Sequence, residues 1–246
     1  MGKDADKVLS DLEERLEFFR DIGADFIFRS EKAPAPAQTA AAESSLSPSP
    51  SSAPKLPAAA MDIQTVHEEI LGCRKCPLAA GRTQAVPGEG NTRARLMFVG
   101  EGPGHDEDVQ GRPFVGRAGQ LLTKIIQAMK FDRSEVFITN VVKCRPPNNR
   151  VPHRDEVEIC TPYLLEQIRN IRPEVIVTLG KIAADFFISH TLGGMTSLRG
   201  HFHDWLGIPV MPTFHPSYLV RNEGNKELRR MVWGDMQKVM ARLDKK

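Results

Sequence analysis

The sequence predicts an α/β protein in which a small four-stranded parallel sheet is flanked by helices on both faces. Two observations carry this prediction. Apolar runs with the length of buried strands recur along the chain, and amphipathic helical patterns alternate with them. Strands that alternate with helices form βαβ units, whose crossover helices cover both faces of a parallel sheet. The region that carries this alternation follows an extension of different composition.

Four short apolar runs predict the strands of this sheet. Continuous apolar runs of this length, bounded by turn residues, are typical of strands that are buried on both faces. They are Leu96–Val99, Val136–Val142, Val175–Leu179 and Val210–Phe214.

Four longer segments predict the helices, because their apolar residues recur every three or four positions. They lie near Ala118–Met129, Arg154–Arg169, Ile182–Ser189 and Lys226–Leu243. We expect His201, His203 and Trp205 to lie in a loop.

The first 60 residues divide into two parts, ahead of a folded domain over residues 61–246. Residues 1–32 are expected to contain a short amphipathic helix, since apolar residues from Leu9 to Phe19 have helical spacing. Ala, Pro and Ser fill 22 of the 28 positions of residues 33–60. That composition buries too little apolar surface to offset the entropy of ordering and predicts a disordered linker. The helix is either an incidental appendage or a tethered docking element for a partner protein.

The overall composition excludes several classes of protein. Hydrophobic residues make up 41% and charged residues 26% of the 246 positions, as in a globular protein. No apolar run approaches the roughly 18 residues of a membrane span, and the charged N-terminus does not look like a secretory signal, so we expect a cytoplasmic protein. Residues 1–60 carry 7 Lys or Arg and 10 Asp or Glu, whereas the remainder carries 26 and 21. This mildly basic domain permits nucleic-acid binding but does not by itself indicate it.

Polar residues accompany three of the predicted strands. The turn Gly-Glu-Gly-Pro-Gly (100–104) follows the first strand, Asn140 lies within the second, and His215 follows the fourth. Each alone has an ordinary structural interpretation. Because ligands of open parallel sheets bind beyond the carboxyl ends of the strands, their joint occurrence predicts one site at that edge.

The glycine-rich turn does not match a nucleotide-binding motif. Neither GxGxxG nor GxxxxGK[ST] is present, and Pro103 removes an amide donor. The glycines more plausibly let the backbone approach a substrate closely. A second loop, Gly111–Gly116, carries Phe114, which either stacks on a planar base or anchors the loop in the core.

The four cysteines have the spacing of a metal site. Cys73 and Cys76 form a CxxC, whereas Cys144 follows the second predicted strand and Cys160 lies further along the chain. In the cytosol such thiols stay reduced, which argues against disulfides. Zinc ribbons usually supply a second CxxC, so the spacing leaves zinc, an iron–sulfur cluster and unliganded thiols open.

Taken together, these motifs resemble the family 4 uracil-DNA glycosylases, the iron–sulfur type known from thermophiles. The segment 100–104 is similar to the first motif of that family, and His-Pro-Ser-Tyr-Leu (215–219) is similar to its second. The loop GRPFVGRAG (111–119), the segment TNVVKC (139–144) and the four cysteines also match, in the same order. The resemblance covers about Val66 to Leu243, and the joint occurrence of these elements is highly specific.

The resemblance implies a fold, a function and a cofactor. The fold would be that of the uracil-DNA glycosylases, and the enzyme would remove uracil from single- or double-stranded DNA to leave an abasic site, which initiates base excision repair. A 4Fe–4S cluster would be held by Cys73, Cys76, Cys144 and Cys160. We expect a monomer, and the N-terminal helix could bind another repair or replication protein.

Roles in base recognition also follow from the resemblance. Phe114 would stack on the extruded uracil, and Asn140 would accept from N3–H and donate to O4, a pattern that cytosine does not offer. Glu107 would exclude the C5 methyl of thymine, Gly102 would line the base site, and His215 would donate to O2 as negative charge gathers there.

Water activation and DNA binding are implied in the same way. Glu101 would position or deprotonate the attacking water. Better-known uracil glycosylases place an aspartate where this sequence has Gly102. Leu219 would fill the gap that the flipped base leaves, and Ser217 and Arg221 would contact phosphates.

Two other functions compete with excision. A related branch traps uracil-DNA covalently, but its extra basic, His-bearing insertion is missing from the segment PPNNRVPHRDE (146–156). A cluster-bearing electron-transfer or interaction module would leave Glu101, Asn140 and His215 without a reason to converge. The sequence therefore favours the glycosylase.

Overall fold

A computed structural model describes residues 58–188 and 194–244 of the chain. The expected N-terminal helix and almost all of the expected linker lie outside these residues, and the division into three segments stays a prediction. In the described part of the chain, no helix has both the length and the apolar character needed to cross a bilayer.

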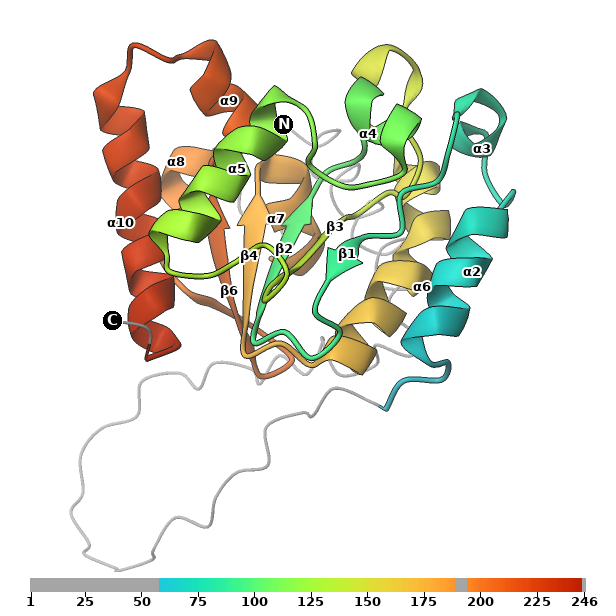
Figure 1. Cartoon of the computed structure of the whole chain (residues 1–246), viewed down its shortest axis with the longest axis horizontal. Coiled ribbons are helices and arrows are strands. Elements are labelled where there is room, and N and C mark those ends of the chain that lie inside the picture. Colours follow the sequence, from blue (N-terminus) through green and yellow to red (C-terminus); the bar gives the residue numbers. More distant parts are fainter. Residues whose placement is uncertain (1–57, 189–193, 245–246) are drawn as a thin grey trace, which may run out of the picture. The chain divides into compact units, whose positions relative to one another are not determined.

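The sheet has six strands in the order β1-β3-β2-β4-β6-β5 (Figure 1). The four predicted strands form its parallel centre, with β2 paired to β3 and β4, and β4 paired to β6. The strands are β1 Glu89–Gly90, β2 Leu96–Gly100, β3 Phe137–Asn140, β4 Val175–Leu179, β5 His203–Trp205 and β6 Ile208–Thr213.

Two edge strands correct the expected count of four. Both β1 and β5 pair antiparallel with their neighbours, and both are too short to form an alternating pattern in the sequence. The expectation that His203 and Trp205 lie in a loop was wrong, because both belong to β5. Short edge strands also limit the exposed backbone that could pair with another chain.

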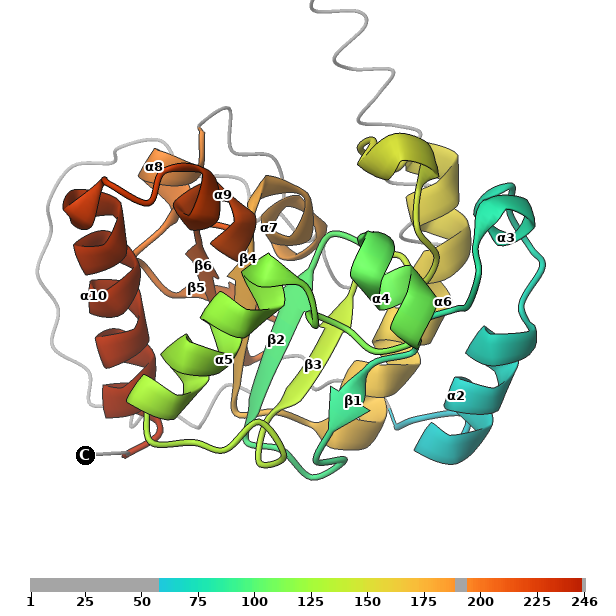
Figure 2. The ribbon, with the colours of Figure 1, turned by 45° about the horizontal axis from the view of Figure 1, so that its top comes forward.

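Helices cover both faces of the sheet, as predicted (Figures 1 and 2). Helices α5 and α10 pack on one face, and α6 and α7 lie on the other. The helices are α2 Ile63–Gly72, α3 Leu78–Gly81, α4 His105–Gln110, α5 Arg117–Ala128, α6 Arg154–Ile171, α7 Lys181–Phe187, α8 Met195–Leu198, α9 Pro216–Arg221 and α10 Lys226–Arg242, with a 3-10 turn at Pro147–Asn149.

The main core lies between the sheet and the pair α5 and α10. Alternate residues of the central strands, such as Phe98 and Val177, meet Leu122 of α5 and Val239 of α10, and all four are fully buried. Such side chains stabilise a fold by about 1.5–3 kcal/mol each when they leave water. This packing fixes the sheet as a rigid platform for the loops at its ends.

The strand order places a crevice at one point of the sheet. The chain runs from β2 to β3 on one side and later to β4 on the other side of β2. Loops that leave neighbouring strands in opposite directions open a gap beyond the carboxyl ends, where ligands of open α/β sheets bind. The gap therefore lies beyond Gly100 and Leu179.

Candidate active site

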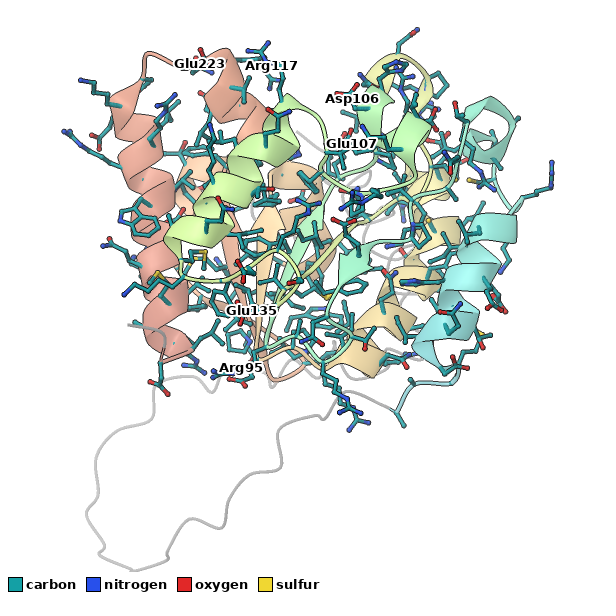
Figure 3. All side chains as sticks on the ribbon, in the orientation of Figure 1. Arg95, Asp106, Glu107, Arg117, Glu135 and Glu223 are labelled. Carbon is teal, nitrogen blue, oxygen red and sulfur yellow. The ribbon has the colours of Figure 1, made fainter. Side chains whose placement is uncertain are left out.

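A cleft of about 450 Å³ lies at this crevice. Glu101, Asn140 and His215 all line it, so the structure brings together the three polar groups that the sequence placed at strand ends. Figure 3 shows Glu107 and Arg117 at this end of the sheet and Arg95 and Glu135 at the opposite end.

Asn140 carries the most distinctive atom of the cleft. It is the last residue of β3, it is 1% exposed, and its side-chain Oδ1 has no hydrogen-bond partner. A Cβ on Gly100, the last residue of β2, would collide with this oxygen and with the Phe114 ring. The glycine therefore allows the amide and the ring to come close together, and the oxygen keeps unused hydrogen-bonding capacity beside the cleft.

Phe114 forms the wall beside Asn140. Its ring centroid is 5.6 Å from that of His215, and its backbone φ is +50°, which is unfavourable for a bulky residue. The first turn of α5 packs closely against the backbone of Phe114, because a Cβ on Gly119 would collide with the Phe114 carbonyl. The ring is 6% exposed and packs in the core, as one interpretation of the sequence expected, and it also lines the cleft. Its stacking on a base stays a prediction.

Glu107 ties two loops of the cleft together. Its carboxylate accepts hydrogen bonds from the backbone N–H groups of Val115 (2.8 Å), Gly116 (2.9 Å) and Gly104 (3.1 Å). This one side chain thus fixes the position of the turn after β2 relative to the Phe114 loop.

Hydrogen bonds from Arg133 also hold the Phe114 loop in place. Arg133 donates to Glu89 Oε1 at 2.6 Å, to Thr123 Oγ1 at 3.2 Å and to the carbonyl of Pro113, the residue before Phe114. Arg112 also donates to Glu89, at 2.7 Å, but its side chain is 60% exposed against 18% for Arg133. The pKa of Glu89 is lowered, because its hydrogen bonds with the two arginines outweigh the opposing effect of burial. The ion pair with Arg133 is the better shielded of the two.

His215 is held neutral with a defined tautomer. The backbone N–H of Ser217 donates to its Nδ1 at 3.1 Å, and Ser217 Oγ lies 2.7 Å from the same atom. Nδ1 is therefore the acceptor, and Nε2 carries the proton. Burial, with a smaller effect from nearby Arg221, lowers the pKa of His215 to about 4. The cleft thus has a neutral N–H donor at neutral pH.

Glu101 faces the cleft from the turn after β2. Burial raises the pKa of its carboxyl group above the usual range. A carboxylate whose pKa moves toward neutrality is a stronger general base than an exposed one.

The four cysteines line one small cavity away from the cleft. Cys144 Sγ accepts from Arg82 Nη1 at 2.8 Å, and Cys160 Sγ accepts from the backbone N–H of Lys143 at 3.3 Å. Burial raises the pKa of both buried thiols, that of Cys160 to about 11. In residues 58–188 and 194–244, no three His, Cys, Asp or Glu side chains are placed to hold a single metal ion.

Comparison with known proteins decides the family. Residues 87–237 match the model of the uracil DNA glycosylase superfamily. The chain belongs to this superfamily. It is similar to a type-4 uracil-DNA glycosylase of Thermotoga maritima, with 50% identity over 74% of this chain and 95% of the relative.

Two further relatives carry the same name. A type-4 uracil-DNA glycosylase of Saccharolobus solfataricus is 43% identical over 75% of this chain and 88% of the relative. One from Sulfurisphaera tokodaii is 45% identical over 72% of this chain and 83% of the relative. The resemblance to the type-4 enzymes that the motifs indicated is confirmed.

The phosphate-binding residues expected from that resemblance lie on α9 of this glycosylase. Ser217 and Arg221 both line the cleft, and Arg221 Nη1 lies 3.4 Å from Ser217 Oγ. Leu219, in contrast, is 3% exposed and packs with Phe214 and Val232 in a small core. To fill a gap in DNA, Leu219 would have to leave that core.

Three residues that line the cleft were not among the site residues assigned from the sequence. Asn149, Arg150 and Lys181 line the cleft, although only Lys181 follows a strand. Arg150 is held by the buried Glu156 at 2.6 Å. The sequence feature that could have indicated Lys181 is its position after β4, the one predicted strand for which no polar site residue was assigned.

The buried Lys143 was also missed. Its ammonium donates to Thr139 Oγ1 at 2.7 Å, Gln167 Oε1 at 2.7 Å and the backbone oxygen of Asn140 at 2.6 Å. Burial lowers its pKa to about 7. Lysine is usually exposed, so nothing in the sequence marked it as internal.

Proposed function

We propose that this chain hydrolyses the N-glycosyl bond between uracil and deoxyribose in DNA and leaves an abasic site. The observation that carries the proposal is the buried, unpaired Oδ1 of Asn140 beside the rings of Phe114 and His215. An unpaired buried acceptor costs free energy unless a ligand satisfies it, and uracil N3–H is a donor of the right kind.

Asn140 would separate uracil from cytosine. Its Oδ1 accepts from uracil N3–H and its amide donates to O4, whereas cytosine offers an acceptor at N3 and an amine at position 4. A wrong base would leave buried polar groups unpaired, which is how hydrogen-bonding sites reach strong discrimination. Phe114 would stack on the base, and Gly102 would let the backbone approach it.

Glu107 would reject thymine by occupying space at the C5 edge of the base. Its carboxylate lines the cleft and is fixed by backbone hydrogen bonds from both neighbouring loops. Moving it to admit a methyl group would break those bonds, so the carboxylate would act as a rigid barrier to thymine.

His215 would stabilise the leaving uracil. As the N1–C1′ bond breaks, negative charge gathers on the base, including O2. A neutral Nε2–H group, oriented by Ser217, can donate a hydrogen bond to that oxygen without transferring its proton. Such preorganised donors are commonly the largest contribution to catalysis.

Glu101 would act on the attacking water. It is the carboxylate of the cleft whose pKa burial raises, so it can orient the water and take its proton once ionised. Ser217 and Arg221 would bind phosphates at the rim, which makes affinity fall as salt rises.

The four cysteines would hold a 4Fe–4S cluster. Such a cluster takes one thiolate at each of four iron corners, so its ligands surround a cavity instead of pointing at one atom. The cavity between Cys73, Cys76, Cys144 and Cys160 has this character, and Arg82 donates into it. When bound, the cluster supplies a crosslink that joins α2 and the segment after β3 to α6. A monomeric state, a cytoplasmic location and a partner for the N-terminal helix stay predictions.

Base release from a uracil-containing oligonucleotide tests the function. The strand is cleaved with alkali after incubation, with otherwise identical thymine and cytosine strands as controls, and the same samples are run on a denaturing gel for protein–DNA adducts. We expect catalytic cleavage at uracil alone. A heat-resistant adduct without turnover would instead identify a trapping protein, and neither product from protein that holds its iron would overturn the proposal.

A further inference from the structure

Removing a base from a duplex leaves a gap between its stacked neighbours. Proteins that open base steps commonly insert an apolar or aromatic side chain there, because unstacking costs a few kcal/mol. The inserted side chain must lie beside the cleft and be exposed to the DNA before binding. These two requirements can be checked for each residue of α9, the helix that follows His215.

The geometry of α9 excludes Leu219 from this role. Ser217 and Arg221 both line the cleft, which defines the face that α9 presents to it. Successive helical residues are about 100° apart, so Leu219 lies on the opposite face. The packing agrees, since Leu219 is 3% exposed and contacts Phe214 and Val232.

Tyr218 is exposed and directly follows Ser217, which lines the cleft. It is 40% exposed, one of the few large hydrophobic residues that are exposed in the described part of the chain, and it lies between Ser217 and the buried Leu219. Its backbone N–H donates to the carbonyl of His215 at 2.9 Å, which fixes its position relative to the catalytic histidine.

The ring of Tyr218 packs against the ring of Phe214. Its centroid is 5.4 Å from that of Phe214, and the guanidinium of Arg199 lies 5.6 Å from the centroid of the Phe214 ring. Arg199 is held in turn by the buried Asp235. A supported aromatic ring loses little conformational freedom when it inserts.

We propose that Tyr218, not Leu219, is the side chain that stacks in the gap left by the extruded uracil; this inference rests on the proposed function. Figure 2 shows α9 beside the start of α5, and Figure 3 shows Arg117 and Glu223 at the same rim. Arg117 and Arg221 would bring the phosphates of the strand to this rim, with the tyrosine ring directed at the base step.

The test compares excision of uracil from a duplex with excision from the single strand of identical sequence. The variants are Tyr218→Ala, Tyr218→Phe and Leu219→Ala, measured in the full chain with its cofactor. Filling a gap matters mainly in the duplex, whereas any loss of folded protein lowers both activities equally. The duplex to single-strand ratio of kcat/KM therefore isolates insertion from stability.

We expect Tyr218→Ala to lower that ratio about 10-fold, the lower part of the range for base–aromatic stacking. Tyr218→Phe should keep the ratio within about 2-fold, because stacking needs the ring and not the hydroxyl. Leu219→Ala should reduce thermal stability and leave the ratio unchanged, with Leu219→Met as a substitute if the alanine variant does not fold.

An unchanged ratio in Tyr218→Ala, or a lowered ratio in the leucine variants alone, would overturn the inference. These results differ from a failure of the proposed function, in which the wild-type chain would release uracil from neither substrate.

Discussion

The cleft and the cysteine cavity lie at the two ends of the short segment from Asn140 to Cys144, yet they differ in shape and in hydrogen bonding. The cleft is open, contains a buried oxygen without a partner, and relies on a residue with unfavourable φ. The cysteine cavity is small, and its two buried thiols both accept hydrogen bonds. The proposed substrate site thus keeps unused hydrogen-bonding capacity, whereas the cavity proposed to hold the cluster is shielded.

The variant with the largest expected effect removes the unpaired oxygen of Asn140. Asn140→Ala should lower kcat/KM on uracil DNA by about 100-fold or more, as for the loss of a preorganised catalytic or specificity group. Its free energy of unfolding should change little, because the oxygen makes no bond within the protein. Steady-state kinetics and thermal melting measure the two effects.

Thr178→Val is the matched control for that variant. Thr178 is also fully buried with an unpaired Oγ1, but it lies within β4 and not at the cleft. Full activity is expected. A loss of activity in Thr178→Val comparable to that in Asn140→Ala would mean that the effect follows from removing any buried oxygen and not from the position of Asn140 in the cleft.

Cys160→Ala should produce the reverse result. We expect loss of bound iron and of visible absorption, and a fall in Tm on the order of 10 °C, since about 1 kcal/mol corresponds to 2–4 °C in a domain of this size. The preference for uracil over thymine in the remaining folded protein should persist. Iron assay, melting and excision measured per folded molecule check this.

Thr161→Val supplies the control for the cysteine variant. Thr161 is next to Cys160, is buried, and donates to the Val157 carbonyl at 2.8 Å, so the change removes a polar contact but no thiol. Loss of thymine discrimination in Cys160→Ala would show that the two regions cannot be separated.

The pH dependence of activity distinguishes the two titratable groups of the cleft. Burial raises the pKa of Glu101, and the group must be ionised to accept a proton, so kcat should rise with pH through that raised pKa. Burial lowers the pKa of His215 to about 4, so His215 stays neutral above that pH and adds no inflection near neutrality. A pH profile of wild type and Glu101→Gln measures this, with the inflection expected to vanish in the variant.

The smallest expected effect concerns the support of Phe114. Arg133→Met removes the shielded donor to Glu89 and Pro113 and should raise KM by about 3- to 10-fold, equivalent to a net loss of roughly 1 kcal/mol. Arg112→Met removes the exposed donor to the same Glu89 and should change KM by less than about 2-fold. Equal effects of the two variants would refute the idea that Arg133 positions the loop.

The sequence predicted the central parallel strands and the long helices because each carries a strong periodic or continuous apolar signal. It missed β1 and β5 because strands of two and three residues have no period to detect. Pairing with β3 and β6 creates them, and that pairing is a property of the folded sheet.

Within the site, the sequence indicated the groups that directly follow strands and missed those that depend on packing. Asn140 and His215 could be placed from strand ends and motif resemblance. The face of α9 that buries Leu219 and exposes Tyr218 depends on the register of a six-residue helix against the Phe214 core. The tie between Glu89 and Arg133 joins residues 44 positions apart, so no local pattern could reveal it.

The hydrogen bonds of Lys143, in the segment after β3, have a consequence for protein engineering. The ammonium donates to the backbone oxygen of Asn140 at 2.6 Å, and the backbone N–H of Lys143 donates to Cys160 Sγ at 3.3 Å. Transplanting the Asn140 amide, which we propose to bind uracil, into another scaffold would therefore require Lys143, its partners Thr139 and Gln167, and Cys160 in the same graft. The set of residues to be transplanted together is therefore larger than the set that lines the cleft.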